Sequence, residues 1–474
     1  MVEYGHGILR SEAPLIDHAR PAWRCNAGPA AGSAASNVFH GTLSAAARAH
    51  PMSSAGLPNR RKMNAAPRIL MLAPEPFFEP RGTPFSEYHR IKALLELGYQ
   101  IDLVTYPVGQ DVDLPNLRIY RCARPPFVRR VAIGPSLRKI LLDLLLAVTA
   151  FRLARPGRYV AIHSHEEAGI IGVWLARRLG IPHLYDMHSS LPQQLANFSY
   201  SRSKLIRWCF ERSEQAMLEG SQIVITICPA LQDTAVATGA GDRAILIENV
   251  MGGDVEPVAE VIPVRERWGI GAGAPLVLYT GTFESYQGLD LLFAAASHLA
   301  ATHPEARVLV VGGNPDQVVA AKSAAERTGA PLVFTGRRPA HEIPAFVSAC
   351  DVLASPRVAG TNTPLKIYSY LRSGRPIVAT DLRTHTQVLD PGTAVLTPPD
   401  PAAFAEALGR LLDAPDERRR IAAAAAALAA DKYSRASYLA RTREAYDRLL
   451  GAAAAPAPTG GSGARGETGP VAAL

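Results

Sequence analysis

Short apolar runs alternate with helix-length amphipathic stretches along most of this chain, and the whole alternation occurs twice. The first set comprises Arg68–Leu72, Gln100–Thr105, Val160–Ser164, His183–Asp186 and Gln222–Ile227. The second set follows position 275 and reads LVLYTG, RVLVVGG, LVFTG, DVLAS, PIVAT and AVLT. Apolar runs that are continuous rather than alternating are typical of parallel strands buried on both faces. The pattern therefore predicts an α/β protein with two doubly wound domains.

Composition sets the expected limits of these domains. Residues 1–65 are rich in Ala, Gly, Pro, Ser and Arg and have no periodicity, so we predict a disordered leader. Residues 451–474 have the composition of a flexible tail. The first domain is expected at 66–250 and the second at 266–432. A Gly- and Pro-containing linker at 251–265 separates them.

Several classes of protein are excluded or disfavoured by the same sequence. No apolar run approaches the roughly 20 residues that span a bilayer, and the N-terminus lacks the pattern of a signal peptide. The 5 cysteines are scattered and include no Cys-x-x-Cys pair, which indicates a reducing, cytoplasmic setting without disulfides or a zinc knuckle. The formal charge of +8 is concentrated locally, so a nucleic-acid partner is not expected.

One basic segment, residues 118–158, carries ten Lys or Arg and a single acid. Within it we predict a helix from Leu137 to about Arg155, capped by Ser136. The apolar residues of this helix form one stripe, and further leucines lie elsewhere on its circumference. Such a helix either lies between the sheet and a neighbour or meets a lipid surface. The cluster of arginines favours binding to an anionic membrane or to an anionic acceptor. On a membrane, the protein is expected to lie peripherally on the inner face.

The strongest functional signal follows the predicted strand that ends at Ser355. The next helix is expected to open at Pro364, with Lys366 in its first turn. A cation at the positive end of a helix is unfavourable unless an anion binds there. The backbone amides of residues 361–365, together with Lys366 and Arg357, could hold a diphosphate without a metal.

The loop after the first strand is a second candidate. Thr83 is a suitable N-cap and Pro84 a suitable first-turn residue for a helix expected at Phe85–Leu97. Gly82 would then lie where backbone amides point outward. The loop is either an anion or substrate loop or simply a well-capped connection.

Histidines at two strand ends complete the candidates. His163 and His165 resemble metal ligands, but nothing else with ligand spacing is nearby, so no metal is predicted. His165 and Glu167 could instead form a polar lip of the cleft. His188 follows the next strand, where either a structural role or a role in the cleft is consistent with its position.

Six segments in the expected order resemble the retaining glycosyltransferases of the GT-B fold, the group 1 or family 4 enzymes. They are RILMLAP…RGTPFSEYHRIKALLELGYQIDLVT, YDMHSS, IENV at 247–250, VLYTGTFESYQGLDLLF, LVFTGRRP…ACDVLASP and TPLKIYSYLRSGRPIVAT. The resemblance implies two Rossmann-like domains facing across a cleft. It also implies a nucleotide-sugar donor on the second domain, an acceptor on the first, and a last helix, 433–450, that crosses back to the first domain.

The resemblance also implies roles for particular residues. His188 would line the donor-sugar pocket, Lys366 would stabilise the leaving diphosphate, and Arg337 would lie near the nucleobase. Asn249 belongs to the hinge region. The donor-binding set implied by the resemblance and the loop analysis is Gly82, Gly281, Thr282, Arg337, Arg357, Gly360, Thr361, Asn362, Thr363, Pro364, Leu365 and Ser369.

The chain departs from the family pattern at four positions. Thr282 and Gln287 stand where the family has an Arg and a Lys, and Thr361 and Ser369 stand where it has paired glutamates. Lys366 and Arg357 are thus left as the expected cations.

The first hypothesis is metal-independent, retaining transfer of a sugar from a nucleotide-diphosphate sugar to a glycan or lipid-linked acceptor, with no further cofactor. Two alternatives are a nucleotide-sugar epimerase on the same fold and a catalytically silent binding protein in a glycan-assembly complex. Release of a free isomerised sugar would favour the first alternative. Failure to bind any nucleotide sugar would favour the second.

Overall fold

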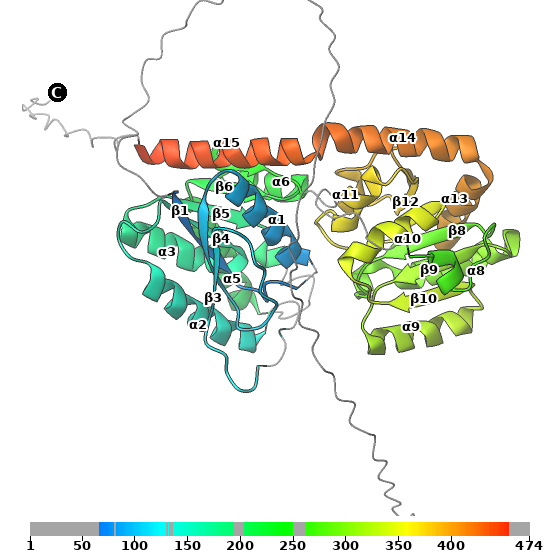
Figure 1. The fold of residues 1–474 in the computed structure, drawn as a ribbon, viewed down its shortest axis with the longest axis horizontal. Coiled ribbons are helices and arrows are strands. Elements are labelled where there is room, and N and C mark those ends of the chain that lie inside the picture. The colour runs from blue at the N-terminus through cyan, green and yellow to red at the C-terminus, as the bar shows by residue number, and fades with distance from the viewer. Residues whose placement is uncertain are drawn as a thin grey trace, which may run out of the picture. The chain divides into compact units, whose positions relative to one another are not determined.

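Two parallel β-sheets, each covered by helices on both faces, organise the chain in the computed structural model (Figure 1). The structure describes residues 66–79, 82–128, 131, 136–193, 203–249 and 262–454, which all fall within the unit Lys62–Leu474. The predicted leader, most of the predicted linker and residues 455–474 lie outside the described residues.

The first sheet has seven strands in the order β3-β2-β1-β4-β5-β6-β7, all parallel. Its strands are β1 (Arg68–Ala73), β2 (Gln100–Thr105), β3 (Leu117–Arg121), β4 (Ala161–His165), β5 (His183–Met187), β6 (Ile223–Thr226) and β7 (Ala244–Leu246). Its helices are α1 (Gly82–Glu96), α2 (Leu137–Leu153), the short η1 (Glu166–Ala168), α3 (Gly169–Leu179), α5 (Lys204–Gly220), α6 (Pro229–Ala237) and η2 (Gly241–Arg243).

The second sheet has six parallel strands in the order β10-β9-β8-β11-β12-β13. Its strands are β8 (Leu276–Thr280), β9 (Arg307–Val311), β10 (Leu332–Gly336), β11 (Val352–Ser355), β12 (Ile377–Thr380) and β13 (Val395–Thr397). Its helices are α7 (Val264–Arg267), η3 (Ser285–Gln287), α8 (Leu289–Thr302), α9 (Pro315–Thr328), η4 (Ala340–Glu342), α10 (Ile343–Ala349), α11 (Leu365–Arg372), α12 (Arg383–Thr386), α13 (Pro401–Asp413) and α14 (Pro415–Lys432).

Alternate side chains of each strand enter different cores, as the pleat requires. Ile69 and Met71 of β1 pack toward α1, whereas Leu70 and Leu72 pack toward α2 and α3. The central strands are buried at almost every position because both faces are covered. The prediction of doubly wound parallel sheets from continuous apolar runs is confirmed.

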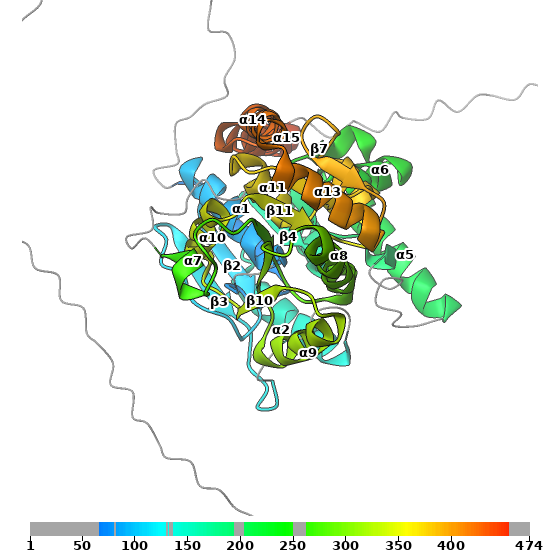
Figure 2. The same ribbon diagram turned by 90° about the vertical axis from the view of Figure 1, so that its right-hand side faces the viewer.

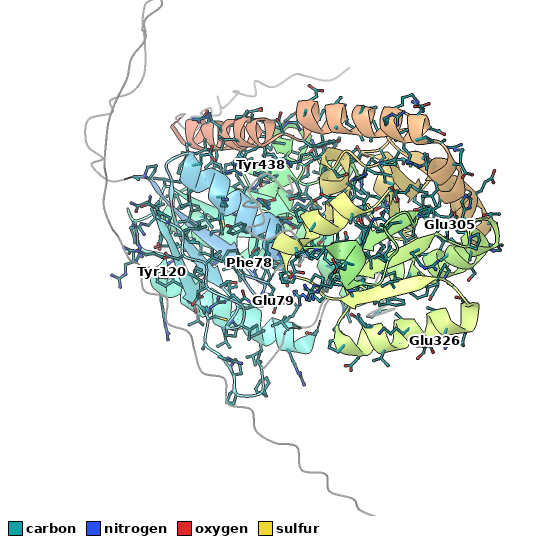
Figure 3. All side chains as sticks on the ribbon, turned by 45° about the vertical axis from the view of Figure 1, so that its right-hand side comes forward. Phe78, Glu79, Tyr120, Glu305, Glu326 and Tyr438 are labelled. Carbon is teal, nitrogen blue, oxygen red and sulfur yellow. The ribbon has the colours of Figure 1, made fainter. Side chains whose placement is uncertain are left out.

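The last helix, α15 (Arg435–Ala454), packs on α1 and β6 of the first sheet, whereas the preceding α14 packs on α11 and α13 of the second. Figures 1 and 2 show α14 and α15 along the same side of the two sheets. Tyr438, Tyr446 and Leu449 of α15 are buried in the core of the first sheet (Figure 3 labels Tyr438). The chain therefore crosses back, as the resemblance implied.

Four local expectations differ from the structure. Helix α1 begins at Gly82, so Thr83 lies inside its first turn and is not the N-cap. The edge strands β3 and β7 were not predicted, since β3 lies within the basic segment and β7 has only three residues. Helix α7 begins inside the predicted linker. Helix α15 continues to Ala454, into the predicted tail, because its alanines extend a helix readily.

Candidate functional site

A cleft of about 1300 Å³ lies at the carboxyl ends of both sheets. In each sheet the strand order reverses between two central strands, β1 and β4 in the first and β8 and β11 in the second. The loops after these four strands line the cleft, as expected at the switch points of doubly wound sheets. The volume exceeds that of a typical single-ligand pocket, so the cleft has room for two substrates.

Lys366 is the central cation on the second-sheet wall. It lies in the first turn of α11, where the leading backbone amides lack intrahelical acceptors. Its Nζ atom lies 3.9 Å from the centroid of the Tyr279 ring and has no hydrogen-bond acceptor among the described residues. Burial, with a further contribution from the charge of Arg357, holds the pKa of Lys366 well below its usual range. An anion entering the cleft would relieve this desolvated ammonium.

Arg357 shapes the loop in front of Lys366. Its Nε donates to the carbonyl of Ala359 (2.8 Å) and its Nη1 to the carbonyl of Asn362 (2.9 Å). A Cβ at Gly360 would lie 2.4 Å from Nη2 of Arg357, and the φ of Gly360 is +113°, so only glycine fits this position. Burial lowers the pKa of Arg357. The guanidinium thus folds the loop into a cradle and adds a second positive charge beside it.

The loop after β8 forms the other side of this cradle. Tyr279 donates from its hydroxyl to the carbonyl of Thr282 (2.8 Å), which ties the loop to the strand below. A Cβ at Gly281 would lie 3.6 Å from Nζ of Lys366 and 2.9 Å from the Tyr279 hydroxyl. The absence of a side chain at Gly281 keeps the space around the ammonium open. Tyr279 was not identified from the sequence, because nothing in LVLYTG distinguishes a core tyrosine from one beneath a ligand.

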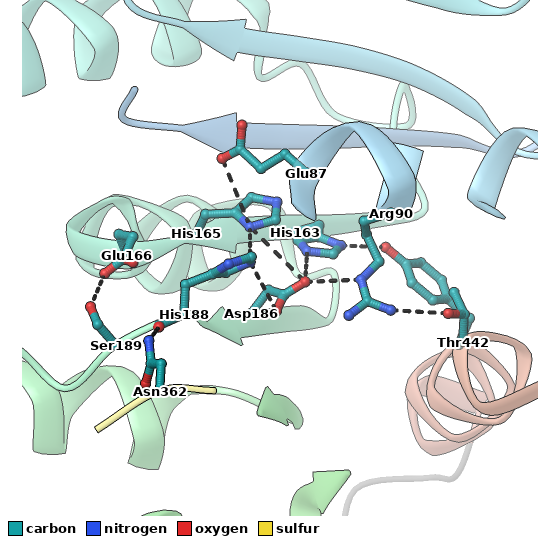
Figure 4. Close-up of polar contacts among 11 residues, drawn as sticks. Glu87, Arg90, His163, His165, Glu166, Asp186, His188, Ser189, Asn362 and Thr442 are labelled. Atoms are coloured by element: carbon teal, nitrogen blue, oxygen red, sulfur yellow. Dashed lines mark hydrogen bonds and ion pairs between the residues drawn. The ribbon is translucent and has the colours of Figure 1, made fainter. Parts of the chain in front are cut away.

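His188 lies on the first-sheet wall within a buried polar network (Figure 4). Its Nε2 is 3.3 Å from Oδ1 of Asp186 and 3.1 Å from Nδ1 of His165. Any contact of the imidazole with a substrate therefore falls to Nδ1. The carbonyl of His188 accepts a hydrogen bond from Nδ2 of Asn362 at 2.6 Å, which links the first-sheet wall to the loop of the second sheet.

Arg90 anchors this network from α1. Its Nε donates to Oδ2 of Asp186 at 3.0 Å, and its Nη1 donates to the hydroxyl of Thr442 on α15 at 3.0 Å. The guanidinium also lies over the ring of Tyr438, 4.8 Å from its centroid. Burial alone would raise the pKa of Asp186, but the charge of Arg90 and the interactions with His188 and His163 together outweigh burial and hold that pKa well below its usual range. The crossover helix thereby contacts the residues that orient His188.

The same network explains why His163, His165 and Asp186 lie close together. Donor atoms of His163, His165 and Asp186 lie within 4.8 Å of one another. However, the guanidinium of Arg90 already pairs with Asp186, and Nδ1 of His163 bonds the Tyr446 hydroxyl at 2.8 Å. Burial lowers the pKa of both histidines, so they are neutral partners of an ion pair. A cation would have to displace Arg90, and we assign no metal to this cluster.

Two carboxyl groups also line the first-sheet wall. Glu167 lines the cleft and pairs with Lys139 at 2.8 Å. Glu166 also lines it, accepts a hydrogen bond from Ser189 (2.6 Å), and has its pKa raised to about 7 by burial and by the charge of Glu167. Behind them, burial and the charge of Glu75 raise the pKa of Glu87 well above its usual range. Glu167 is thus paired, and the raised pKa values of Glu166 and Glu87 disfavour their charged forms, which suits a polar, uncharged ligand.

The structure brings most of the sequence-predicted residues to this cleft. Those that line it are Gly82, His188, Gly281, Thr282, Arg337, Arg357, Gly360, Thr361, Asn362, Pro364, Leu365, Lys366 and Ser369. Thr363 and Asn249 are buried and do not line it. His165 is also fully buried behind His188, so the expected polar lip is formed by Glu167 without His165. Gln287, at the second position of departure from the family pattern, lies on the cleft wall as well.

Comparison with known families supports this architecture. The family "Glycosyl transferase 4-like domain" matches residues 88–249, and the family "Glycosyl transferases group 1" matches residues 274–414. The first match covers β2 to β7 of the first sheet but not β1 or the loop after it, and the second covers all six strands of the second sheet.

Individual relatives are also glycosyltransferases. The chain is 27% identical to a D-inositol 3-phosphate glycosyltransferase of Frankia alni over 72% of this chain and 88% of that protein. It is 24% identical to the alpha-D-kanosaminyltransferase of Streptomyces kanamyceticus over 58% of this chain and 73% of that protein. Neither the epimerase nor the silent binding protein is favoured by these relatives.

Solved structures agree on the fold. Sucrose-phosphate synthase from Thermosynechococcus elongatus superimposes with a TM-score of 0.66 at 19% identity, covering 81% of this chain and 100% of that structure. HepE from Anabaena, solved in complex with UDP, superimposes with a TM-score of 0.61 at 17% identity, again covering 81% and 100%. The fold expected from the sequence, GT-B, is confirmed.

Proposed function

Because this chain belongs to the group 1 glycosyltransferases of the GT-B fold, we propose that it transfers a sugar from a nucleotide-diphosphate sugar to a hydroxyl of a glycan or lipid-linked acceptor. The observation that carries the proposal is Lys366, a residue of the cleft wall beside the N-terminus of α11, whose buried ammonium has no acceptor among the described residues. A diphosphate supplies the negative charge that this position lacks. The complex of HepE with UDP is consistent with this choice of donor.

In the proposed mechanism, the second-sheet wall stabilises charge that develops on the leaving diphosphate. Lys366, Arg357 and the first amides of α11 surround the place where that charge would form. These donors are fixed before the reaction by the helix and by the bonds within the loop, so little reorganisation accompanies bond cleavage. Two cations and a helix terminus supply the positive charge here, so the transfer is proposed to be metal-independent.

The first-sheet wall is proposed to bind the acceptor. Phe85 and Tyr88 offer apolar ring surface, and Glu166, Glu167 and His188 offer hydrogen-bonding groups. This combination suits a polyhydroxylated molecule, which has both apolar C–H faces and hydroxyl edges. The leaving diphosphate would take the proton of the attacking hydroxyl, and the sugar would keep its anomeric configuration.

Turnover of a donor panel tests the proposal. UDP-, GDP- and ADP-glucose and UDP-N-acetylglucosamine would be incubated with the protein and a set of glycan and lipid-linked acceptors, and release of the nucleoside diphosphate would be measured. We expect one donor to be consumed only when an acceptor is present, and Lys366→Ala to lower kcat/KM for it by about 100-fold. The anomeric configuration of the initial product, read by proton NMR, tests retention. Unchanged kcat/KM in Lys366→Ala would remove the role of Lys366.

A further inference from the structure

The outward face of α2 is apolar, although it faces solvent. Ile140, Leu144, Val148 and Phe151 are 57%, 62%, 46% and 41% exposed, and Leu141 is also exposed. The opposite face of the same helix, Leu142, Leu146 and Ala150, is buried in the core of the first sheet. A surface helix normally places its polar side chains outward. An apolar face that is not buried within its own chain marks an interaction surface.

Helix α3 extends this face. Trp174 is 47% exposed, and its ring lies 4.5 Å from that of Phe151 on α2, centroid to centroid. Ile170, one turn earlier on α3, is 47% exposed as well. The two helices thus share one continuous apolar surface, which we call the α2–α3 face. Its members are Ile140, Leu141, Leu144, Val148, Phe151, Ile170 and Trp174.

Arginines border the α2–α3 face, and no exposed acid accompanies them among the described residues of α2 and α3. The exposed cations are Arg138, Arg152, Arg155, Arg177 and Arg178. Arg178 lies over the Trp174 ring at 5.6 Å. The one acid of α2, Asp143, accepts a hydrogen bond from the buried Tyr106 hydroxyl at 2.5 Å and is not exposed. The surface is therefore both apolar and cationic.

We propose that the α2–α3 face docks this protein on the surface of a bilayer that contains anionic lipids. Apolar side chains between arginines suit the interface, where the rings and aliphatic groups reach the acyl boundary and the guanidinium groups meet headgroup phosphates. A tryptophan on such a surface is typical of the membrane–water interface. No described helix is long and apolar enough to span a membrane, so the attachment is peripheral.

The structure narrows the surface that the sequence indicated. Within 118–158, Arg121 pairs with Asp111 at 2.7 Å and Arg158 pairs with the buried Asp102 at 2.6 Å. These two arginines are held in ion pairs of the first domain and are not counted in the docking surface. Residues 129–130 and 132–135 lie outside the described residues. The docking surface instead gains Ile170, Trp174, Arg177 and Arg178 from α3.

The position of α2 suggests what docking would achieve, an inference that rests on the proposed function. Lys139 lines the cleft, and the next residue, Ile140, begins the α2–α3 face. Docking would therefore hold the first-sheet wall of the cleft close to the bilayer. An acceptor carried on a lipid would reach the cleft without leaving the membrane.

Vesicle co-sedimentation of the full chain tests the docking without any donor or acceptor. We expect binding to vesicles of phosphatidylglycerol and phosphatidylcholine in equal parts, little binding to phosphatidylcholine alone, and loss of binding as NaCl rises from 50 to 500 mM. Each arginine removed should weaken binding about fivefold at low salt. Arg177→Ser/Arg178→Ser should therefore lose about 25-fold, and Leu144→Ser/Phe151→Ser about tenfold.

Matched controls lie on α9 of the second sheet. Val319 is 66% exposed, and Lys322 and Arg327 are exposed cations of the same helix. Val319→Ser and Lys322→Ser/Arg327→Ser should bind vesicles as the unchanged protein does. Trp174 should shift its fluorescence to shorter wavelength on binding, and Trp174→Phe should lose that shift.

Three results would overturn the docking proposal. They are equal binding to both kinds of vesicle, equal losses in the α9 and α2–α3 variants, and a concentration-dependent dimer, seen by light scattering, that Leu144→Ser/Phe151→Ser abolishes. Thermal unfolding checks that the variants are folded. Nucleotide binding by the same variants, measured separately, should be unchanged, so a failure of the docking is distinguishable from a failure of the proposed transfer.

Discussion

The ammonium of Lys366 lies 3.9 Å from the centre of the Tyr279 ring and has no anionic partner among the described residues. The face of an aromatic ring offsets only part of the desolvation free energy of a buried cation. The ligand-free protein is therefore destabilised at this position. Lys366→Met should therefore raise the free energy of unfolding by about 1 kcal/mol. It should also weaken binding of the nucleoside diphosphate by roughly 10- to 100-fold, because a charge-assisted hydrogen bond is lost.

Acid–base linkage gives this prediction a second measurement. The pKa of Lys366 is lowered in the folded state, so the buried charge destabilises the fold at pH values below the unfolded pKa. This destabilisation decreases as the pH rises toward the usual pKa range of lysine. The stability gained in Lys366→Met should shrink as the pH rises from 7 to 10. Diphosphate binding should raise the pKa, so calorimetry in buffers of different ionisation enthalpy should show proton uptake. Lys366→Met that unfolds more easily than the unchanged protein would contradict this account.

The hydrogen bond from Asn362 to the carbonyl of His188 predicts a role in holding the two walls of the cleft together. Asn362→Ala should remove this hydrogen bond and about 1 kcal/mol of interaction free energy between the two walls. It should also lower kcat/KM severalfold. Asp233 and Arg383 form another ion pair between elements of the two sheets, but both side chains are 66% exposed. Asp233→Ala should change kcat/KM less than twofold, since exposed pairs contribute little. Steady-state kinetics of both variants checks the contrast.

Thr442 on α15 predicts an effect at a distance on His188. Thr442→Val removes the hydroxyl that accepts from Arg90, which in turn positions Asp186 and His188. We expect kcat to fall severalfold with the affinity for nucleoside diphosphate unchanged, and Thr442→Ser to retain activity. Equal losses in both variants would indicate packing alone.

Metal dependence separates the proposed diphosphate site from one that relies on a divalent cation. The positive charge at the cradle comes from Lys366, Arg357 and the N-terminus of α11. Activity should therefore be retained, within about twofold, in excess EDTA. Loss of activity on chelation and its restoration by Mg²⁺ or Mn²⁺ would contradict a metal-independent transfer.

The fold was predictable because burial on both faces of a parallel strand leaves a local mark on the sequence. RILML and LVLYT are apolar at all but one position for that reason, and both became central strands. The edge strand Leu117–Arg121 escaped prediction because none of its residues is fully buried. Its side chains are partly polar, as edges tolerate, so its sequence carries no such mark.

The site was predictable where its residues follow a strand or begin a helix, because those positions are marked locally in the sequence. Lys366 places a positive charge at the positive end of a helix, which is unfavourable and can be recognised in the sequence. Arg90 and Asp186 are 96 residues apart, and Arg90 and Thr442 are 352 apart, so their contacts arise only from the folding of the chain. The exposed apolar face of α2 was likewise visible as a stripe, but which stripe faced the core depended on the sheet beneath it.

Glu166 predicts a pH dependence of stability. Its pKa is raised to about 7 by burial and by the charge of Glu167, against an ordinary value of 4.5. The folded protein therefore binds a proton that the unfolded chain releases, and the resulting stability is present at low pH and is lost as the pH rises from 4.5 through 7. Glu166→Gln removes the titration.

The variant and the unchanged protein should then have similar stabilities near pH 4.5. The variant should become the more stable as the pH rises, by at most about 3 kcal/mol above pH 8. Urea unfolding at pH 4.5, 6 and 8 measures this difference. Glu305→Gln, at the exposed position labelled in Figure 3, serves as the matched control and should show no such trend. A stability difference that is largest at pH 4.5 would reverse the sign and show that the proton on Glu166 does not stabilise the fold.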